Sequence, residues 1–259
     1  MNTDEYLPFA EHLANQARPV SLAHFGSRLA VDNKRARTNG FDPVTLADRA
    51  TEDILRRLIE ETFPEHGIWG EEGGEKAGRG TLTWVLDPID GTRSYICGIP
   101  LWGTLIALCD GDVPILGLAD FPALGQRFLA TAGGPALGNG QPLACRPCDT
   151  LNTAMMMTTD PDMFAPGPET EAYGRLERTV RLRRFGGDCF AWCLLAGGQI
   201  DLVVEGDLQP YDIRALIPII EASGGIVTTW DGGPATNGGL VVAAGDPAVH
   251  RQALDILGR

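Results

Sequence analysis

Two carboxylates crowd the end of an apolar segment in WVLDPIDGT, residues 84–92. Asp87 and Asp90 lie three positions apart, and the proline between them stiffens the turn. Like charges this close repel each other, and burial increases the cost. A bound cation would remove that cost, and hard divalent ions such as Mg²⁺ prefer oxygen ligands. The segment therefore indicates a metal site, to which the Ile89 carbonyl could add a further oxygen.

Three more segments place acids at the edge of an apolar element. FDPVTLADRA contains Asp42 and Asp48, IWGEEGG contains Glu71 and Glu72, and QPYDIRAL contains Asp212. A shared Mg²⁺ site needs oxygen ligands from several such segments. However, acids at strand ends and helix N-termini are also common as caps, and Asp212 fits a helix cap equally well. Spacing alone leaves both interpretations open.

The composition is that of a globular protein with an excess of acids. Its 259 residues carry a formal net charge of −13, which argues against nucleic acid or an anionic membrane as the main partner. We find no signal-peptide pattern and no apolar window long enough for a membrane span, so we expect a cytoplasmic protein. The six scattered cysteines are then expected to be reduced thiols. CRPC at 145–148 could be half of a zinc site, but no second CxxC follows it.

The apolar patterns predict an α/β (α+β) fold of layered sheets and helices. Helices are expected over 5–32, with a possible break at Arg18-Pro19, and over 45–62. A strand over 81–87 and an antiparallel meander over 102–134 follow. Further along, the sequence predicts strands at 181–185, 200–206, 226–230 and 240–244, and helices at 188–198, 211–225 and from 246 onward. We expect one compact unit with an N-terminal part, 1–145, and a C-terminal part, 146–259.

Taken together, these motifs resemble those of the inositol monophosphatase family of Mg²⁺-dependent, lithium-sensitive phosphatases. WVLDPIDGT is similar to the family signature D-P-[IL]-D-G-[TS], and GEE to its upstream metal glutamate. DPVTLADRATE and PYDIRALIPIIEASGG resemble its early and late acidic segments, in the same order. The resemblance extends from about residue 40 to 245, and it implies a layered αβαβα sandwich and a homodimer. Tyr211 stands where the family usually has tryptophan, so an aromatic residue is retained.

The resemblance also implies roles for these residues. Two to three Mg²⁺ ions would be held by Glu71, Asp87, the Ile89 carbonyl, Asp90 and Asp212. Glu71 and Thr92 would orient the attacking water, and Asp90 would complete the catalytic group. The reaction implied is in-line hydrolysis of a phosphate monoester without a phospho-enzyme.

The same resemblance assigns the surroundings of the metal site. The backbone N–H groups of Gly91 and Thr92 would hold the phosphate. Arg93 would contact the phosphate or pin the loop, unless it forms a structural ion pair at the dimer interface. Asp42 and Thr45 would support the site from behind.

The C-terminal part suggests the substrate. Gly186-Gly187-Asp188-Cys189 stands where inositol-cleaving members carry small uncharged residues, and Glu205 is a second acid expected to face the same space, beside Asp212. Buried acids favour a cationic ligand. The segments DGTRSYICGIPLWGTLIAL and FGGDCFAWCLLAGG are most similar to the histidinol-phosphate phosphatase branch, where Asp188 and Glu205 would bind the ammonium and imidazole groups. Asp188 could instead cap the helix that follows it.

Three alternatives to a histidinol-phosphate phosphatase remain. One is an inositol-1-monophosphatase or a broad sugar phosphatase with fructose-1,6-bisphosphatase-like activity. A nucleotide phosphatase acting on 3′-phosphoadenosine phosphates fits less well, because members of that branch are generally longer. A non-catalytic phosphate-binding homologue should have lost a metal acid or Thr92, and this sequence has kept them all.

Overall fold

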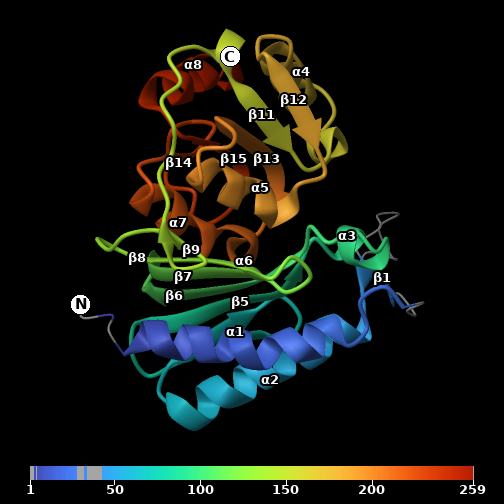
Figure 1. Cartoon of the computed structure of the whole chain (residues 1–259), viewed down its shortest axis with the longest axis vertical. Helices are drawn as coiled ribbons and strands as arrows, with labels where there is room; N and C mark the ends of the chain where they lie inside the picture. Colours follow the sequence, from blue (N-terminus) through green and yellow to red (C-terminus); the bar gives the residue numbers. More distant parts are fainter. Residues whose placement is uncertain (1–2, 4, 28–31, 34–42, 259) are drawn as a thin grey trace.

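The computed structural model describes residues 3, 5–27, 32–33 and 43–258, which stack into five layers (Figure 1). Helices α1 (Tyr6–Leu22) and α2 (Leu46–Thr62) form the outer layer at the bottom of the view. An eight-stranded sheet, a layer of helices, a five-stranded sheet and a last layer of helices follow. The predicted αβαβα sandwich is therefore confirmed.

The eight-stranded sheet is built from residues 67–142 in the order β10-β9-β8-β7-β6-β5-β3-β4. Its strands are β3 (Gly67–Gly70), β4 (Gly74–Lys76), β5 (Leu82–Asp90), β6 (Gly103–Asp110), β7 (Val113–Phe121), β8 (Gln126–Thr131), β9 (Leu137–Gly138) and β10 (Gln141–Pro142). Strands β6, β7 and β8 form the predicted antiparallel meander. In contrast, β3 pairs with β5 in parallel, so the carboxyl ends of these two strands meet at one edge of the sheet.

The five-stranded sheet has the order β12-β11-β13-β15-β14. Its strands are β11 (Met155–Thr158), β12 (Leu182–Phe185), β13 (Leu202–Leu208), β14 (Ile226–Thr229) and β15 (Gly239–Ala244). The helices of this half are α4 (Pro168–Glu177), α5 (Asp188–Ala196), α6 (Pro210–Ile213), α7 (Leu216–Ala222) and α8 (Pro247–Leu257). Two short helical turns, η1 (Leu151–Thr153) and η2 (Pro161–Met163), flank β11. A short α3 (Thr92–Ile96) follows β5, and β1 (Asp32–Asn33) pairs with β2 (Pro43–Val44) as a separate ribbon.

Of the four apolar clusters found among the described residues, three hold the layers together. The largest lies between the two sheets, where Leu105 of β6 and Val203 of β13 belong to one buried cluster with Trp192 of α5. A second joins α1 and α2 to the outer face of the eight-stranded sheet, and a third joins α4 and α8 to the five-stranded sheet. Burial of apolar surface on both faces of each sheet favours this stack. Among the described residues, no helix has the length and apolar character needed to cross a membrane.

The helix predicted over 45–62 is confirmed, because α2 begins immediately after Thr45 and ends at Thr62. Thr45 and Asp48 form its capping box: the Thr45 hydroxyl accepts from the Ala47 N–H at 3.1 Å, and Asp48 accepts from the Thr45 N–H at 2.8 Å. The sequence pattern T-x-x-D therefore sets this boundary.

Two other helix predictions need correction. The first helix ends at Leu22 and not at 32, since turns occupy 23–26 and Asp32 is in a strand; residues 28–31 lie outside the described part. Pro19 does not break it, because it falls in the last turn, where little helix remains to lose hydrogen bonds. The helix predicted over 211–225 is two pieces, α6 and α7. At the break the Ala215 carbonyl packs closely on Gly117 of β7. A Cβ atom on Gly117 would lie only 2.0 Å from the Ala215 carbonyl oxygen.

Candidate metal-binding active site

A β-bulge brings Asp87 and Asp90 to one site. Residues three apart on a regular strand point to opposite faces of the sheet. Here Asp87 pairs with Leu105 and Asp90 pairs with Gly103. Between these two pairs β5 therefore has one residue more than β6, which is a β-bulge. The Thr104 hydroxyl donates to the Pro88 carbonyl at 2.9 Å and secures the bulge. The proline between the acids therefore belongs to a local change of register that turns both carboxylates to one cavity.

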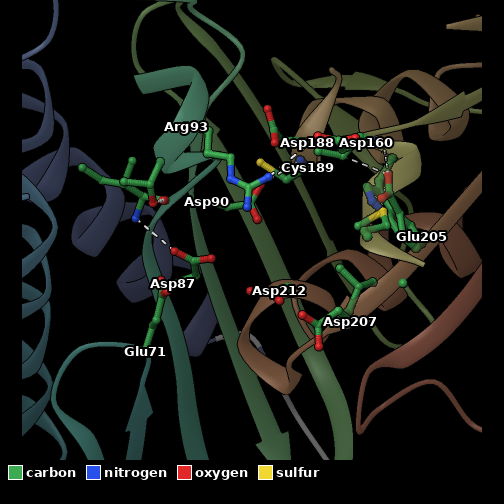
Figure 2. Close-up of a pocket in the computed structure, with 18 of the residues that line it drawn as sticks. Glu71, Asp87, Asp90, Arg93, Asp160, Asp188, Cys189, Glu205, Asp207 and Asp212 are labelled. Carbon is green, nitrogen blue, oxygen red and sulfur yellow. Dashed lines mark hydrogen bonds and ion pairs between the residues drawn. The ribbon is translucent and has the colours of Figure 1, made fainter. Parts of the chain in front are cut away.

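That cavity, of about 510 Å³, opens between the end of β5 and the C-terminal half of the chain (Figure 2). Its lining is dominated by acids, namely Glu71, Asp87, Asp90, Asp160, Asp162, Asp188, Glu205, Asp207 and Asp212. Carboxylate oxygens of Asp87, Asp90 and Asp212 lie within 4.8 Å of one another. The structure thus brings together the predicted acids of three distant segments, and Glu71 lines the same cavity.

Glu71 is placed by the parallel pairing of β3 and β5 and by an acid on α2. Its N–H donates to the Leu86 carbonyl at 3.1 Å, which continues the pairing of β3 with β5. The carboxylate of Glu52 accepts from the next two backbone N–H groups, Glu72 at 2.7 Å and Gly73 at 2.8 Å. At Gly70 a side chain would meet the Glu52 carboxylate at 2.1 Å, so only glycine lets α2 approach this turn.

Asp212 has two functions that the sequence had left as alternatives. Its Oδ2 accepts from the Gln209 N–H at 2.7 Å, which caps the N-terminus of α6. The same side chain belongs to the acid group of the cavity. A cap at this position therefore fixes the carboxylate beside Asp87 and Asp90 and does not argue against a metal role.

Thr92 lies at the start of α3, directly after Gly91, whose φ of 82° a side chain would rarely adopt. The Thr92 hydroxyl is 3.1 Å from the Ile89 carbonyl oxygen and 3.4 Å from Oδ1 of Asp48. The other Asp48 oxygen accepts from the Thr45 hydroxyl at 2.6 Å. Asp48 therefore connects Thr45 to Thr92, and the supporting role of Thr45 remains a prediction; Asp42 lies outside the described residues.

Burial and mutual repulsion raise the pKa values of the central acids. Asp87 is only 1% exposed, and burial, followed by the charges of Glu71, Asp90 and Asp212, raises its pKa well above the ordinary range. Burial and then the charge of Asp188 raise the pKa of Asp90 to about 7, against a lowering contribution from hydrogen bonding to Cys189. Ionising these carboxylates together is costly, because they are buried and repel one another. A divalent cation prefers oxygen ligands of this kind and would neutralise their charge.

Asp188 reaches the cavity from the start of α5. Its φ of 43° is unusual for a residue with a side chain and marks a position that the fold holds against strain. Its Oδ2 accepts from the Ser94 hydroxyl at 2.6 Å, and an ideal Cβ on Gly91 would lie 3.1 Å from its carboxyl carbon. The N-cap of α5 is Gly187, so the alternative of Asp188 as a helix cap is wrong. Its carboxylate instead links the C-terminal half to the segment after β5.

Glu205 of β13 faces the same cavity with one oxygen bound and one free. Its Oε1 accepts from the Thr159 N–H at 2.9 Å and from the Thr159 hydroxyl at 3.0 Å. Its Oε2 is buried and has no hydrogen-bond partner in the part of the chain that the structure describes. Burial raises the pKa of Glu205 well above its usual range. A buried acceptor of this kind is costly unless a ligand donates to it.

Arg93 is 62% exposed at the rim of the cavity, with Nη1 3.8 Å from Oδ2 of Asp160 (Figure 2). This contact joins the segment after β5 to the loop after β11, which favours the loop-pinning role over the alternatives. The roles of Arg93 toward phosphate and at a dimer interface remain predictions.

The sequence named Asp48 only as an acid at the edge of an element, although the T-x-x-D capping pattern around it was readable. Four residues at or beside the cavity were missed: Ser94, Thr159, Asp160 and Asp207. Nothing in the local pattern distinguishes them, because their place depends on how distant strands pair.

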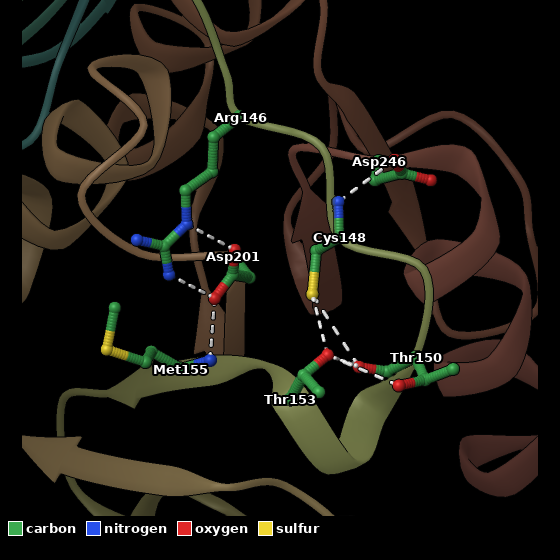
Figure 3. A network of polar contacts seen from close by, with 7 residues as sticks. All are labelled: Arg146, Cys148, Thr150, Thr153, Met155, Asp201 and Asp246. Carbon is green, nitrogen blue, oxygen red and sulfur yellow. Dashed lines mark hydrogen bonds and ion pairs between the residues drawn. The ribbon is translucent and has the colours of Figure 1, made fainter.

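The CRPC segment lies away from this site and is held by hydrogen bonds (Figure 3). Arg146 donates to Asp201 from Nε at 2.7 Å and from Nη2 at 2.5 Å, and the Cys148 N–H donates to Asp246 at 3.1 Å. The Cys148 sulfur is 3.6 Å from both the Thr150 carbonyl and the Thr153 hydroxyl. Over the described ranges, the one group of three or more close metal-ligand side chains is the aspartate trio, and it includes neither cysteine of this segment.

A carboxylate cluster at a strand bulge of a layered sandwich offers the oxygen ligands that divalent cations need, and comparison with known proteins gives the class of protein. The profile of the inositol monophosphatase family matches residues 2–257, and the chain belongs to that family. The expected class of enzyme, a phosphoric monoester hydrolase, is thereby confirmed.

Individual relatives refine this assignment. The chain is 39% identical to the chloroplastic bifunctional phosphatase IMPL2 of Arabidopsis thaliana, over 98% of this chain and 75% of that protein. It is 34% identical to the histidinol-phosphatase of Chlorobaculum parvum, over 97% and 96% of the two chains. Among solved structures, an inositol monophosphatase from Zymomonas mobilis superimposes with a TM-score of 0.89 at 35% identity, and both chains are covered completely. Histidinol-phosphatases are thus among its relatives, as the sequence motifs predicted.

Proposed function

We propose that this chain is a Mg²⁺-dependent phosphatase that hydrolyses L-histidinol phosphate to L-histidinol and phosphate, a step of histidine biosynthesis. The observation that carries the proposal is the buried Oε2 of Glu205, which has no hydrogen-bond partner among the described residues, in a cavity that Asp188 also lines. A leaving group with an ammonium and a protonatable imidazole offers a donor to this oxygen and positive charge to both acids. The similarity to the histidinol-phosphatase of Chlorobaculum parvum supports the same substrate.

Glu71, Asp87, Asp90, Asp212 and the Ile89 carbonyl would hold two to three Mg²⁺ ions. Bound there, Mg²⁺ would neutralise these acids, activate water and stabilise the charge that develops on the phosphate and the leaving oxygen.

The other residues of the cavity would position the reactants. Glu71 and Thr92 would orient the attacking water, and the acceptors within reach of the Thr92 hydroxyl are the Ile89 carbonyl at 3.1 Å and Asp48 at 3.4 Å. The N–H groups of Gly91 and Thr92 would hold the phosphate oxygens. Asp188 and Glu205 would bind the cationic leaving group, so that water attacks phosphorus opposite the departing alkoxide.

An inositol-1-phosphatase, or a broad-specificity sugar phosphatase, is the second candidate. The similarity to the Zymomonas mobilis inositol monophosphatase supports it, and a polyol hydroxyl could also donate to Glu205. The two candidates differ in charge, because inositol offers no cation to a cavity lined by so many acids.

Phosphate release from histidinol phosphate and from inositol-1-phosphate, with Mg²⁺ and with EDTA, tests the proposal. We expect a clear preference for histidinol phosphate, and Asp188→Ala should reduce turnover of that ester far more than turnover of inositol phosphate. A preference for inositol phosphate would exclude the proposed substrate and leave the metal site standing. The homodimer and the cytoplasmic location remain predictions, the first open to light scattering of the purified protein.

A further inference from the structure

The two acids proposed to bind the leaving group are connected by one residue, Thr159, in the loop directly after β11. Its N–H and its hydroxyl both donate to Oε1 of Glu205, at 2.9 and 3.0 Å. Its carbonyl accepts from the Gly186 N–H at 2.9 Å, two residues before Asp188. Through its backbone and side chain, Thr159 thus contacts the strand that carries one acid and the turn that carries the other.

The bonds from Thr159 restrict the Glu205 side chain. With two donors on Oε1, the carboxylate has one orientation that keeps both, and Oε2 is then the oxygen left without a partner. Burial raises the Glu205 pKa well above its usual range, and the two bonds from Thr159 oppose that rise. A cation at Oε2 would favour the ionised form further, whereas a neutral hydroxyl would not, and charge-assisted hydrogen bonds are about twice as strong as neutral ones.

The loop that carries Thr159 is itself held in place. Phe164, five residues further on, is buried in the third core, stacked on Tyr173 at 4.5 Å between ring centroids. The same ring packs so closely on Gly206, next to Glu205, that a Cβ there would meet it at 2.9 Å. The loop and β13 are therefore packed against each other beside the Thr159–Glu205 contact as well.

We infer that Thr159 is a positioning residue for substrate selection: its hydroxyl holds Glu205 so that the free carboxylate oxygen selects a cationic leaving group over a neutral one. This inference rests on the proposed function, because it assigns the cause of the preference for a cationic ester. Thr159 would act through Glu205 and take no part in the attack on phosphorus.

The test compares three threonine variants. Thr159→Val removes only the hydroxyl while keeping the shape of the side chain, and Thr159→Ser restores a hydroxyl. Thr158→Val is the matched control, because Thr158 is the preceding residue, is fully buried, and has its hydroxyl beside Tyr173. For each protein, kcat and KM are measured with histidinol phosphate and with inositol-1-phosphate, together with the thermal unfolding midpoint. Glu205→Gln is the reference for complete loss of the charge.

For Thr159→Val we expect kcat/KM for histidinol phosphate to fall about ten-fold, mainly through KM, as for loss of one hydrogen bond to a charged group. The value for inositol phosphate should fall by a smaller factor, so the ratio between the two esters moves toward that of Glu205→Gln. Thr159→Ser should recover the ratio, and Thr158→Val should keep it.

The failures are distinguishable. If the wild-type enzyme does not prefer histidinol phosphate, the proposed function is wrong and this inference falls with it. If the wild type has the preference and Glu205→Gln loses it, but Thr159→Val keeps it, only the role of Thr159 is overturned. Equal losses for both esters in Thr159→Val would also overturn it, because a merely structural role predicts that result.

Discussion

Buried acids occupy two kinds of place in this molecule. Asp120 of β7 is 1% exposed and lies between two arginines: Arg18 donates to it at 2.6 and 3.1 Å, and Arg127 at 2.8 Å. Asp201 is equally buried and receives two hydrogen bonds from Arg146 and one from the Met155 N–H. Asp87, buried to the same degree, instead has its pKa raised by that burial and then by the charges of three other acids.

The difference separates acids that stabilise the fold from acids that cost it stability. An arginine beside a buried carboxylate compensates for lost hydration, so the pair can connect distant elements, as Asp120 connects α1 to β7 and β8. Acids gathered around a cavity without that compensation are maintained at the expense of stability. A bound cation would offset that cost, as protonation also does, and this is the physical reason to propose a metal there.

The largest expected effect is on activity, from Asp90→Asn. The amide keeps the shape and can still accept from the Cys189 N–H, which now reaches Asp90 at 2.7 Å, but it removes one negative ligand. Loss of metal-assisted charge stabilisation should lower kcat/KM at least about 1,000-fold. Steady-state phosphate release over a range of Mg²⁺ concentrations measures this, and near-normal turnover at saturating Mg²⁺ would contradict a ligand role.

The same substitution should change stability in the opposite direction in metal-free protein. The folded-state pKa of Asp90 is about 7 against an ordinary 3.8, so the folded state holds a proton that the unfolded state releases. The contribution of Asp90 to the free energy of unfolding is then greatest below its ordinary pKa, and it is lost as the pH rises toward 7. Asp90→Asn should therefore gain over wild type between pH 4 and 7, as urea unfolding in EDTA would show; identical pH profiles would refute the raised pKa.

Asp120→Asn should lower stability and leave activity unchanged, in contrast to Asp90→Asn. Removing this charge leaves Arg18 and Arg127 without their shared partner, and it should lower the free energy of unfolding by about 2 kcal/mol, less than for a fully buried pair because Arg18 remains partly exposed. Activity at a temperature well below the unfolding midpoint should stay close to wild type. Urea unfolding and steady-state turnover check the two halves of the prediction. A gain in stability would show that the arginines do not compensate for this acid.

The sequence predicted the elements better than it predicted this division among the acids. The helical period and the Thr45–Asp48 capping pattern determined α2, because both are local. The spacing of Asp87 and Asp90 marked an unusual strand end, although the bulge that lets both face one cavity appears only in the pairing of β5 with β6.

The spacing marked Asp90 and not Asp120, but it could not show what surrounds either acid, since each ends or nearly ends an apolar strand. Only the neighbours brought by folding, Arg18 from one helix and Asp188 from another, give the two acids different roles. Thr159 was missed for the same reason: its contact with Glu205 depends on the parallel pairing of β11 with β13. The family resemblance supplied what local reasoning could not, namely which acids converge.

Glu52 tests the boundary between the two kinds of acid. It is buried and compensated by Arg56 at 2.5 Å, yet its carboxylate also holds the turn that carries Glu71. Glu52→Gln keeps one acceptor oxygen but weakens the bonds to the Glu72 and Gly73 N–H groups. We expect a loss of about 1 kcal/mol in stability and about a ten-fold fall in kcat/KM, both typical of a weakened charge-assisted hydrogen bond.

The matched control is Glu60→Gln, on the same helix, where an exposed glutamate pairs with Lys76 of β4 at 3.1 Å. An exposed pair contributes little, so this variant should change neither stability nor turnover measurably. If Glu52→Gln loses stability alone, Glu52 belongs with Asp120 among the structural acids, and Glu71 keeps its place without it. If turnover falls as well, and raising Mg²⁺ restores part of it, then a compensated acid acts on the metal site by fixing the backbone that presents a ligand. Glu52 would in that case be both paired with an arginine and needed for activity. The two kinds of acid would then differ in what each carboxylate binds, either backbone N–H groups or a cation.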